Sequence, residues 1–261
     1  MQFHSRPWSA VFGLVFWALL GATPARAETL VIAGDIWCPV NCAADAAQRG
    51  IFVELAEQIF AEAGIEVEYR VLNWARAVHD TRLGKLNALV GAGVQDAPDF
   101  LFSDTAPGIS RMCFYAQPAR LWRYEGLSSL ANVSLGAING YSYGKDIDSY
   151  IRTHRRDSQR VQMASGDNAL AINVEKVELG RIDVVLANTW VMALFLSRNR
   201  MPDALEQVGC RVPDVPIYLA FSPALESSKR YVELFEQGLQ RYRTNGRLQA
   251  LLRAYGVYEA F

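Results

Sequence analysis

The chain has 261 residues, of which 51% are hydrophobic, and it carries 26 Lys and Arg against 27 Asp and Glu, a formal net charge of −1. This length and apolar content allow two lobes with separate hydrophobic cores. The charge balance lacks the basic excess that is typical of nucleic-acid-binding proteins, so we expect no nucleic-acid partner.

The first 27 residues have the organisation of a cleaved secretory signal peptide. A polar start with Arg6 precedes the apolar run 10–22, and Ala25-Arg26-Ala27 is a small-x-small cleavage pattern. A run of about 13 apolar residues is too short to cross a bilayer, which needs roughly 20. We therefore expect cleavage after Ala27 and a soluble mature chain with 24 basic and 27 acidic side chains, a net charge of −3.

All four cysteines follow the predicted cleavage site and would reach an oxidising compartment, which favours disulfides. Cys38 and Cys42 enclose a short local loop, and Cys113 and Cys210 are able to pair if the fold brings them together. A metal site at the CxxxC pattern is the alternative, but the chain lacks the further close-spaced His or Cys that zinc needs. We expect no metal and no cofactor.

Hydrophobic periodicity predicts two α/β units. In the first unit, strands at 29–33, 65–72 and 87–91 alternate with helices at 50–63 and 75–83. In the second unit, strands at 133–138 and 183–187 alternate with helices at 167–179 and 190–197, and a polar turn at 139–144 precedes a further helix. Such alternation is typical of parallel sheets covered by helices.

Extended stretches at 112–116 and 217–221 lie between the units and are interpreted as paired hinge strands, and a helical segment at 228–255 with an interruption at Gly246 ends the chain. The predicted fold class is α/β, with two lobes. Lobe 1 is expected to comprise residues 28–110 and 217–261, and lobe 2 residues 111–216.

The order of these elements resembles that of the family 3 periplasmic solute-binding proteins, which include the polar amino-acid receptors of ABC transporters. The segments that carry the resemblance are spread over residues 29–256, at 50–56, 84–88, 102–104, 180–185, 218–222, 245–248 and 255–256. The resemblance implies a type II periplasmic binding fold, in which two lobes close like a hinge over a ligand held beyond the carboxyl ends of the strands. It also implies a location in the periplasm.

The resemblance assigns ligand-binding roles to several positions of this chain. The family's aromatic positions, which enclose the ligand side chain, correspond to Trp37 and Trp74, where two rings would supply apolar area and cation–π attraction. Each Trp is also compatible with plain packing on the lobe surface. Family members clamp the α-carboxylate with an Arg and the ammonium with a carboxylate, but these positions are Asp96 and Asn188 here. Because an unpaired charge in a closed cleft costs several kcal/mol, an ordinary α-amino acid is not the expected ligand.

Three further features are candidate ligand contacts. Arg76 is able to supply a substitute cation, although an Arg on a helix is often solvated. The turn Gly140-Tyr141-Ser142 precedes a helix, whose N–H groups bind oxygen anions readily. Asp35 follows the first strand and either faces the ligand or caps its own loop.

Other polar residues are expected to have no part in ligand binding. Asp183 lies within a strand motif and is interpreted as structural, and His79, His154 and the basic run 152–156 are interpreted as solvated.

The leading hypothesis is therefore reversible capture of a small polar solute by a monomer, with an ABC permease of the inner membrane as the candidate partner. A periplasmic enzyme on the same fold, like the cyclohexadienyl dehydratases that resemble these receptors, is the first alternative. It is disfavoured because the sequence has no Ser-His-Asp order, no HExxH and no GxxxxGK motif. An orphan protein that presents ligand to a sensor kinase is the second alternative.

Overall fold

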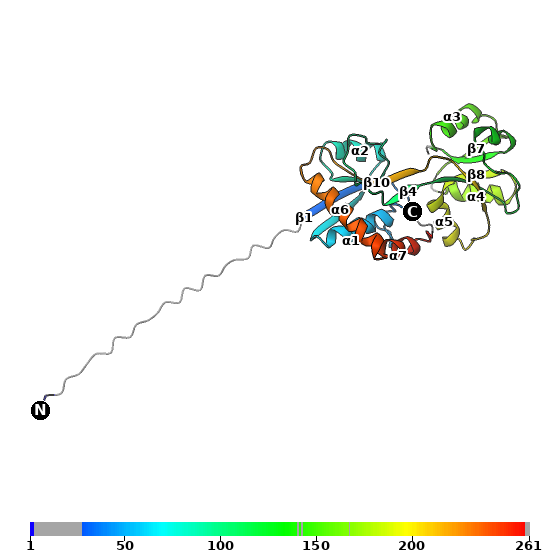
Figure 1. Ribbon diagram of the computed structural model, residues 1–261. Helices are drawn as coiled ribbons and strands as arrows, with labels where there is room; N and C mark the ends of the chain where they lie inside the picture. Colours follow the sequence, from blue (N-terminus) through cyan, green and yellow to red (C-terminus); the bar gives the residue numbers. More distant parts are fainter. Residues whose placement is uncertain (3–27, 140, 142, 167, 259–261) are drawn as a thin grey trace.

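The computed structural model describes residues 1–2, 28–139, 141, 143–166 and 168–258. Apart from Met1 and Gln2, the predicted signal peptide lies outside the described residues. Strand β1 (Glu28–Gly34) begins at the first residue after the predicted cleavage site. From there the chain builds two α/β lobes that lie side by side (Figure 1).

The first lobe is built on a five-stranded mixed sheet with the order β2-β1-β3-β10-β4. β1 runs parallel to both β2 and β3, whereas β10 pairs antiparallel with β3 and β4. The bounds of these strands are β2 Ile65–Val71, β3 Ala88–Ala92, β4 Gly108–Ser110 and β10 Val215–Phe221.

Helices cover both faces of this sheet. α1 (Ile51–Ala61), α6 (Ser227–Thr244) and α7 (Arg247–Ala254) share one core with the inner strands, and α2 (Trp74–Arg82) belongs to a second core on the other side. The apolar side chains of α1 recur at helical spacing and are buried.

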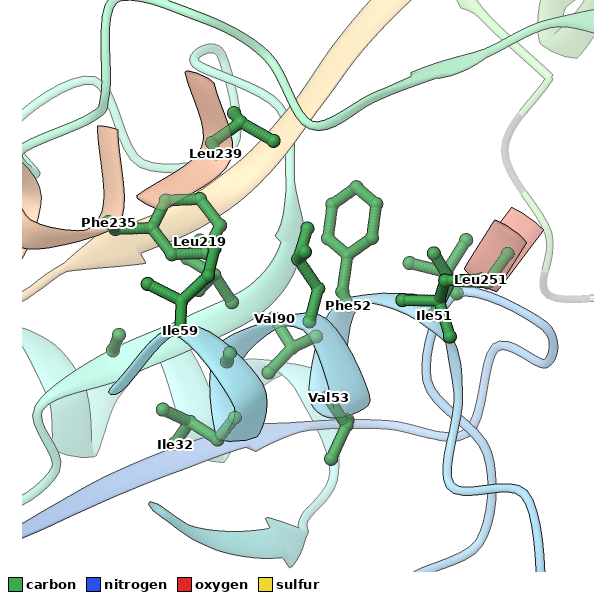
Figure 2. Close-up of a cluster of buried hydrophobic side chains, with 14 of the residues drawn as sticks. Ile32, Ile51, Phe52, Val53, Ile59, Val90, Leu219, Phe235, Leu239 and Leu251 are labelled. Atoms are coloured by element: carbon green, nitrogen blue, oxygen red, sulfur yellow. The ribbon is translucent and has the colours of Figure 1, made fainter. Parts of the chain in front are cut away.

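The larger core of this lobe forms where α1 and α6 meet the sheet (Figure 2). Phe52 and Ile59 of α1, Val90 of β3, Leu219 of β10 and Phe235 of α6 are all at most 2% exposed. Residues far apart in the sequence thus share one core, and the C-terminal helices complete the lobe that β1 begins.

The second lobe has its own five-stranded sheet, in the order β7-β6-β8-β5-β9. β6 is parallel to β7 and β8, and β5 is antiparallel to β8 and β9. The bounds of its strands are β5 Met112–Ala116, β6 Leu135–Ile138, β7 Val161–Ala164, β8 Val184–Asn188 and β9 Glu206–Cys210.

Two cores lie on opposite sides of the second sheet. One contains Ile147 of α3 (Lys145–His154) and Leu130 of the short 3-10 helix η1 (Leu127–Asn132). The other contains side chains of α4 (Ala169–Glu178) and α5 (Thr189–Arg198). The predicted α/β class and the two predicted units are confirmed.

The chain passes between the sheets twice, from β4 to β5 at residues 110–112 and from β9 to β10 at residues 210–215. The stretches 112–116 and 217–221, predicted as hinge strands, form strands β5 and β10. β5 pairs within the second sheet and β10 within the first. The predicted lobe boundaries after residues 110 and 216 stay a proposal.

Within the described part of the chain, none of the helices combines the length and apolarity that crossing a bilayer requires.

Candidate functional site

Loops from both lobes meet beyond the carboxyl ends of the parallel strands. Asp35 follows β1 in the first lobe, and Tyr141 follows β6 in the second. Loss of hydration raises the pKa of the Tyr141 phenol, and the carboxylate of Asp35 raises it further. An electrostatic effect of this kind requires the two groups to lie near each other. Asp35 of the first lobe and Tyr141 of the second therefore lie near each other.

The loop that carries Trp37 is closed by the disulfide between Cys38 and Cys42, whose sulfur atoms are 1.99 Å apart. Inside it the Trp37 N–H donates to the Asn41 carbonyl at 2.8 Å. The half-buried indole lies over β3, because its Cε3 atom would be 3.3 Å from a Cβ placed on Gly91. Gly91 has a φ of +80°, so both its backbone and its contact with Trp37 favour glycine.

The side chain of Asn41 holds the loop that carries Asp35 in place, a role that was not predicted from the sequence. Its side chain is 1% exposed, and its Nδ2 atom donates to the Asp35 carbonyl and to the Tyr69 hydroxyl. Tyr69 in turn donates to the Cys42 carbonyl at 3.1 Å. A polar Asn between two half-cystine positions was the available signal, since buried polar groups are usually hydrogen-bonded.

The Asp35 carboxylate is exposed at the end of β1. Loss of hydration raises its pKa, and a hydrogen bond from its own backbone opposes this shift. No Lys, Arg or His forms an ion pair with it among the described residues. The candidate site thus has an acidic group on its lobe 1 wall.

Trp74 is the first residue of α2 and is half-buried against the core on that side of the sheet. Phe102 packs against the same core, and its ring centroid lies 5.3 Å from that of Tyr218. Trp37 packs instead against the core on the α1 side. The two Trp residues therefore rise from opposite faces of the first sheet.

Arg76 pairs along its own helix with Asp80, from Nε to Oδ2 at 3.4 Å, and its side chain is 72% exposed. Asp80 also accepts from Lys85 Nζ at 3.1 Å. The four-residue spacing of Arg76 and Asp80 was a sequence signal for such a surface pair. The role of Arg76 as a substitute cation stays a proposal.

The two positions where the family carries ion anchors are engaged with this chain's own backbone. Asp96 accepts from the Gly93 N–H at 2.8 Å. Asn188 caps α5, because its Oδ1 atom accepts from the Trp190 N–H at 2.9 Å, and its Nδ2 atom donates to Ser110 Oγ at 3.1 Å. An Asn between a strand and a helix is a typical N-cap.

Of the predicted turn Gly140-Tyr141-Ser142, only Tyr141 belongs to the described residues, and it is 55% exposed. Tyr143 is buried, and its hydroxyl oxygen accepts the Ile138 N–H at 2.7 Å. This bond attaches Tyr143 to the end of β6.

The second predicted disulfide joins Cys113 of β5 to Cys210 of β9, with sulfur atoms 2.01 Å apart. The two residues face each other in neighbouring strands. The disulfide therefore lies within lobe 2, next to both points where the chain passes between the lobes.

The residues that were expected to have no part in ligand binding lie in different surroundings. Asp183 accepts from the backbone and side chain of Ser134 and pairs with Arg120 at 2.7 Å. His79 is exposed, whereas His154 is half-buried and stacks on Tyr150 with ring centroids 4.2 Å apart. The expectation that His154 is solvated is thus only partly met. The described residues contain no cluster of three or more His, Cys, Asp or Glu that is placed to hold a metal ion.

Two lobes, each with its own sheet, linked by two chain crossings and bearing facing loops, define the type II periplasmic binding protein fold. Solved structures confirm this fold. One of them was solved in work on glutathione import via GshT and the cystine ABC importer TcyBC of Streptococcus mutans. It superposes with a TM-score of 0.66 at 15% identity, over 90% of this chain and 98% of the other.

The unliganded, open L-cystine solute receptor of Neisseria gonorrhoeae matches with a TM-score of 0.64 at 15% identity, over 88% of this chain and 94% of the receptor. A histidine kinase sensor domain with similarity to periplasmic binding proteins matches with a TM-score of 0.62 at 19% identity, over 90% and 99% of the two chains. The resemblance to family 3 solute-binding proteins is therefore confirmed at the level of the fold. The sequence matches no family model and no curated protein.

Proposed function

We propose that the mature chain is a periplasmic solute-binding protein that captures a small polar ligand between its two lobes for an ABC-type importer. The fold supports this proposal, because two lobes joined by two short crossings are able to rotate about those crossings and enclose a ligand. Trp37, Trp74 and Tyr141 would supply aromatic contacts to the ligand, and Asp35 an acidic one.

We further propose that the ligand is not an ordinary α-amino acid. The observation that carries this proposal is that Asp96 and Asn188 occupy the family's two ion-anchor positions, while both side chains bind the chain's own backbone. A zwitterion enclosed here would bring its carboxylate toward an acidic side chain at the Asp96 position. Such a repulsion costs affinity instead of adding to it.

The proposed export and the two disulfides support a location in the periplasm, since disulfides persist in oxidising compartments. A second candidate is presentation of the ligand to a sensor protein. The similarity to a histidine kinase sensor domain favours it. Both functions use the same closure around a ligand, and they differ in the protein that recognises the closed form.

A thermal-shift screen of the purified mature chain tests the proposal. The panel should hold amino acids, amines, sugars and small organic acids. A ligand at one hundred times its Kd stabilises the folded state by about 2.7 kcal/mol. We expect one class outside the ordinary α-amino acids to give such a shift, and submicromolar binding of an ordinary α-amino acid would contradict the argument from Asp96 and Asn188.

A pair of Trp variants then locates the bound ligand. Trp74→Ala should weaken binding by at least about 1 kcal/mol, as for other aromatic anchors. Trp122→Ala is the matched control, because Trp122 packs against Phe114 in lobe 2 with ring centroids 5.8 Å apart. Unchanged affinity in Trp74→Ala would show that this ring is no part of the site.

A further inference from the structure

A separate hollow of about 310 Å³ lies on the second lobe, between α3, β7 and the loop after β6. Every described residue that lines it lies in the range 139–163, so none of the described lobe 1 residues contributes to it. Figure 1 shows α3 and β7 next to each other at one end of this lobe. The hollow thus lies beside the proposed solute cleft and shares Tyr141 with it, whereas its arginines are no part of that cleft.

The walls of the hollow combine an apolar part with two cations. Ile151 of α3, Met163 of β7 and the ring of Tyr141 supply the apolar part, and Arg152 and Arg155 supply the charge. Both arginines belong to the basic run that was interpreted as a solvated face. Neither forms an ion pair with any of the described residues.

The charges around the hollow are unbalanced. Arg152 lies in the last turn of α3 and Arg155, three residues later, is its C-cap, so the two like charges are neighbours and repel. Among the described residues of the lining Asp148 is the one acidic side chain, and its Oδ1 atom already accepts the Tyr143 N–H at 2.8 Å. The negative end of the helix dipole stabilises cations near the end of α3, but it does not account for a hollow with apolar walls.

We propose that this hollow binds a small organic anion, with its carboxylate or phosphate between Arg152 and Arg155 and its apolar body against Ile151 and Met163. The planar guanidinium groups suit the oxygen geometry of such anions. The volume suits a ligand of about the size of a substituted benzene ring, because it lies at the lower end of known ligand pockets. The anion contacts Arg152, Arg155, Ile151 and Met163, none of which is proposed to bind the solute, so the site is additional to the solute cleft.

Methyl NMR of the mature chain with ¹³C-labelled methionine tests this site directly. The Met163 methyl group is the reporter within the hollow, and the buried Met192 of α5 is an internal control. Benzoate, benzamide and benzylamine serve as probes, because they share a ring and differ in charge. We expect benzoate to shift the Met163 signal in a saturable way while Met192 stays unmoved, benzamide to bind at least tenfold more weakly, and benzylamine not to bind.

Two double variants with the same change in net charge separate the site from the general field of the lobe. Arg152→Gln/Arg155→Gln should weaken benzoate binding at least tenfold. Arg156→Gln/Arg181→Gln, at two exposed positions outside the lining, should leave it unchanged. A Met163 signal that ignores benzoate, or an equal response in both double variants, would overturn the proposal, as would tighter binding of benzylamine.

The variant Trp74→Ala distinguishes this site from the solute cleft. Benzoate binding should survive this substitution if the hollow is a separate site. Loss of benzoate binding in Trp74→Ala would place the probe in the cleft; the separate site would then be wrong, whereas the proposed solute capture would stand.

Discussion

Trp190 of α5 in the second lobe packs edge-on against Phe52 of α1 in the first, with ring centroids 6.4 Å apart and an interplanar angle of 71°. Trp190 is 4% exposed and belongs to the core of lobe 1. A Cβ on Gly108 would lie only 2.6 Å from the Trp190 ring, so the glycine at the start of β4, just before the first crossing, makes room for this contact. The lobes are therefore joined by a buried aromatic contact as well as by the two chain crossings.

Trp190→Ala should lower the free energy of unfolding by about 3–5 kcal/mol, because it leaves a cavity in the lobe 1 core. Urea unfolding followed by circular dichroism measures this change. Leu121→Ala is the control, since Leu121 is 95% exposed and its truncation should cost less than about 0.5 kcal/mol. A loss below about 1 kcal/mol for Trp190→Ala would show that the ring adds little to the lobe 1 core.

Asn188→Ala should destabilise the chain by about 1–2 kcal/mol, because α5 loses its N-cap and Ser110 loses a hydrogen-bond donor. Asn188→Asp is the matched variant, since its carboxylate still accepts the N–H groups of α5 and favours the helix N-terminus. We expect a smaller loss of unfolding free energy for Asn188→Asp. Equal losses in both variants would assign the effect to the bond with Ser110.

The two disulfides should have different consequences when each is replaced by a pair of alanines. Cys113 and Cys210 are 97 residues apart, and Cys38 and Cys42 are four apart. In the chain-entropy model, closing loops of these lengths is worth about 4.7 and about 2 kcal/mol, respectively. Thermal unfolding should therefore show the larger loss for the Cys113/Cys210 pair.

Loss of the Cys38–Cys42 disulfide should instead weaken ligand binding, because the loop that it closes carries Trp37. Calorimetry with a ligand from the screen should show weaker binding in Cys38→Ala/Cys42→Ala than in Cys113→Ala/Cys210→Ala. The reverse order would separate the Trp37 loop from the site.

Asp183 should make the fold sensitive to acid. Burial would raise the pKa of this carboxyl, but hydrogen bonds from Ser134 and the charge of Arg120 outweigh it, and the pKa of Asp183 lies below its usual value. The unfolded chain therefore takes up a proton more readily than the folded one. The stabilisation by Asp183 is complete above the usual Asp pKa of about 4 and is lost as the pH falls through the lower folded value.

Asp183→Asn should thus lower the free energy of unfolding by about 1–3 kcal/mol at neutral pH. Between about pH 5 and pH 3 the free energy of unfolding should fall less steeply in this variant than in the parent chain. Urea unfolding across this range measures both effects. Asp203→Asn, at an exposed position, should keep the pH dependence of the parent chain. Parallel pH profiles for the parent and Asp183→Asn would contradict the assignment.

Much of the fold follows from local patterns in the sequence. Alternating apolar runs predicted β1, β2, β3, β6 and β8 to within about two residues, because strands buried in parallel sheets are apolar and bounded by turns. β7 and β9 were not predicted, because Val161–Ala164 and Glu206–Cys210 are short and poor in β-branched residues. The strand order of each sheet depends on contacts distant in the sequence, which is why no local pattern predicts that β10 pairs with β3 and β5 with β8.

The local positions of two candidate residues were predictable. Trp37 lies in the loop after β1 and Trp74 begins α2, and their roles as ligand contacts stay predictions. The bonds of Asn41 to Asp35 and Tyr69 join three segments, and no local pattern reveals such a meeting. The hollow beside α3 likewise arises from a helix, a strand and a loop that are neighbours only in the folded chain.

Small-angle X-ray scattering of the mature chain, with and without the strongest ligand from the thermal-shift screen, tests the central claim most directly. If the chain captures its solute between two hinged lobes, saturating ligand should decrease the radius of gyration, and Trp74→Ala should require more ligand to reach the same decrease. A ligand that binds tightly while the radius of gyration stays the same would contradict capture by closure of the lobes.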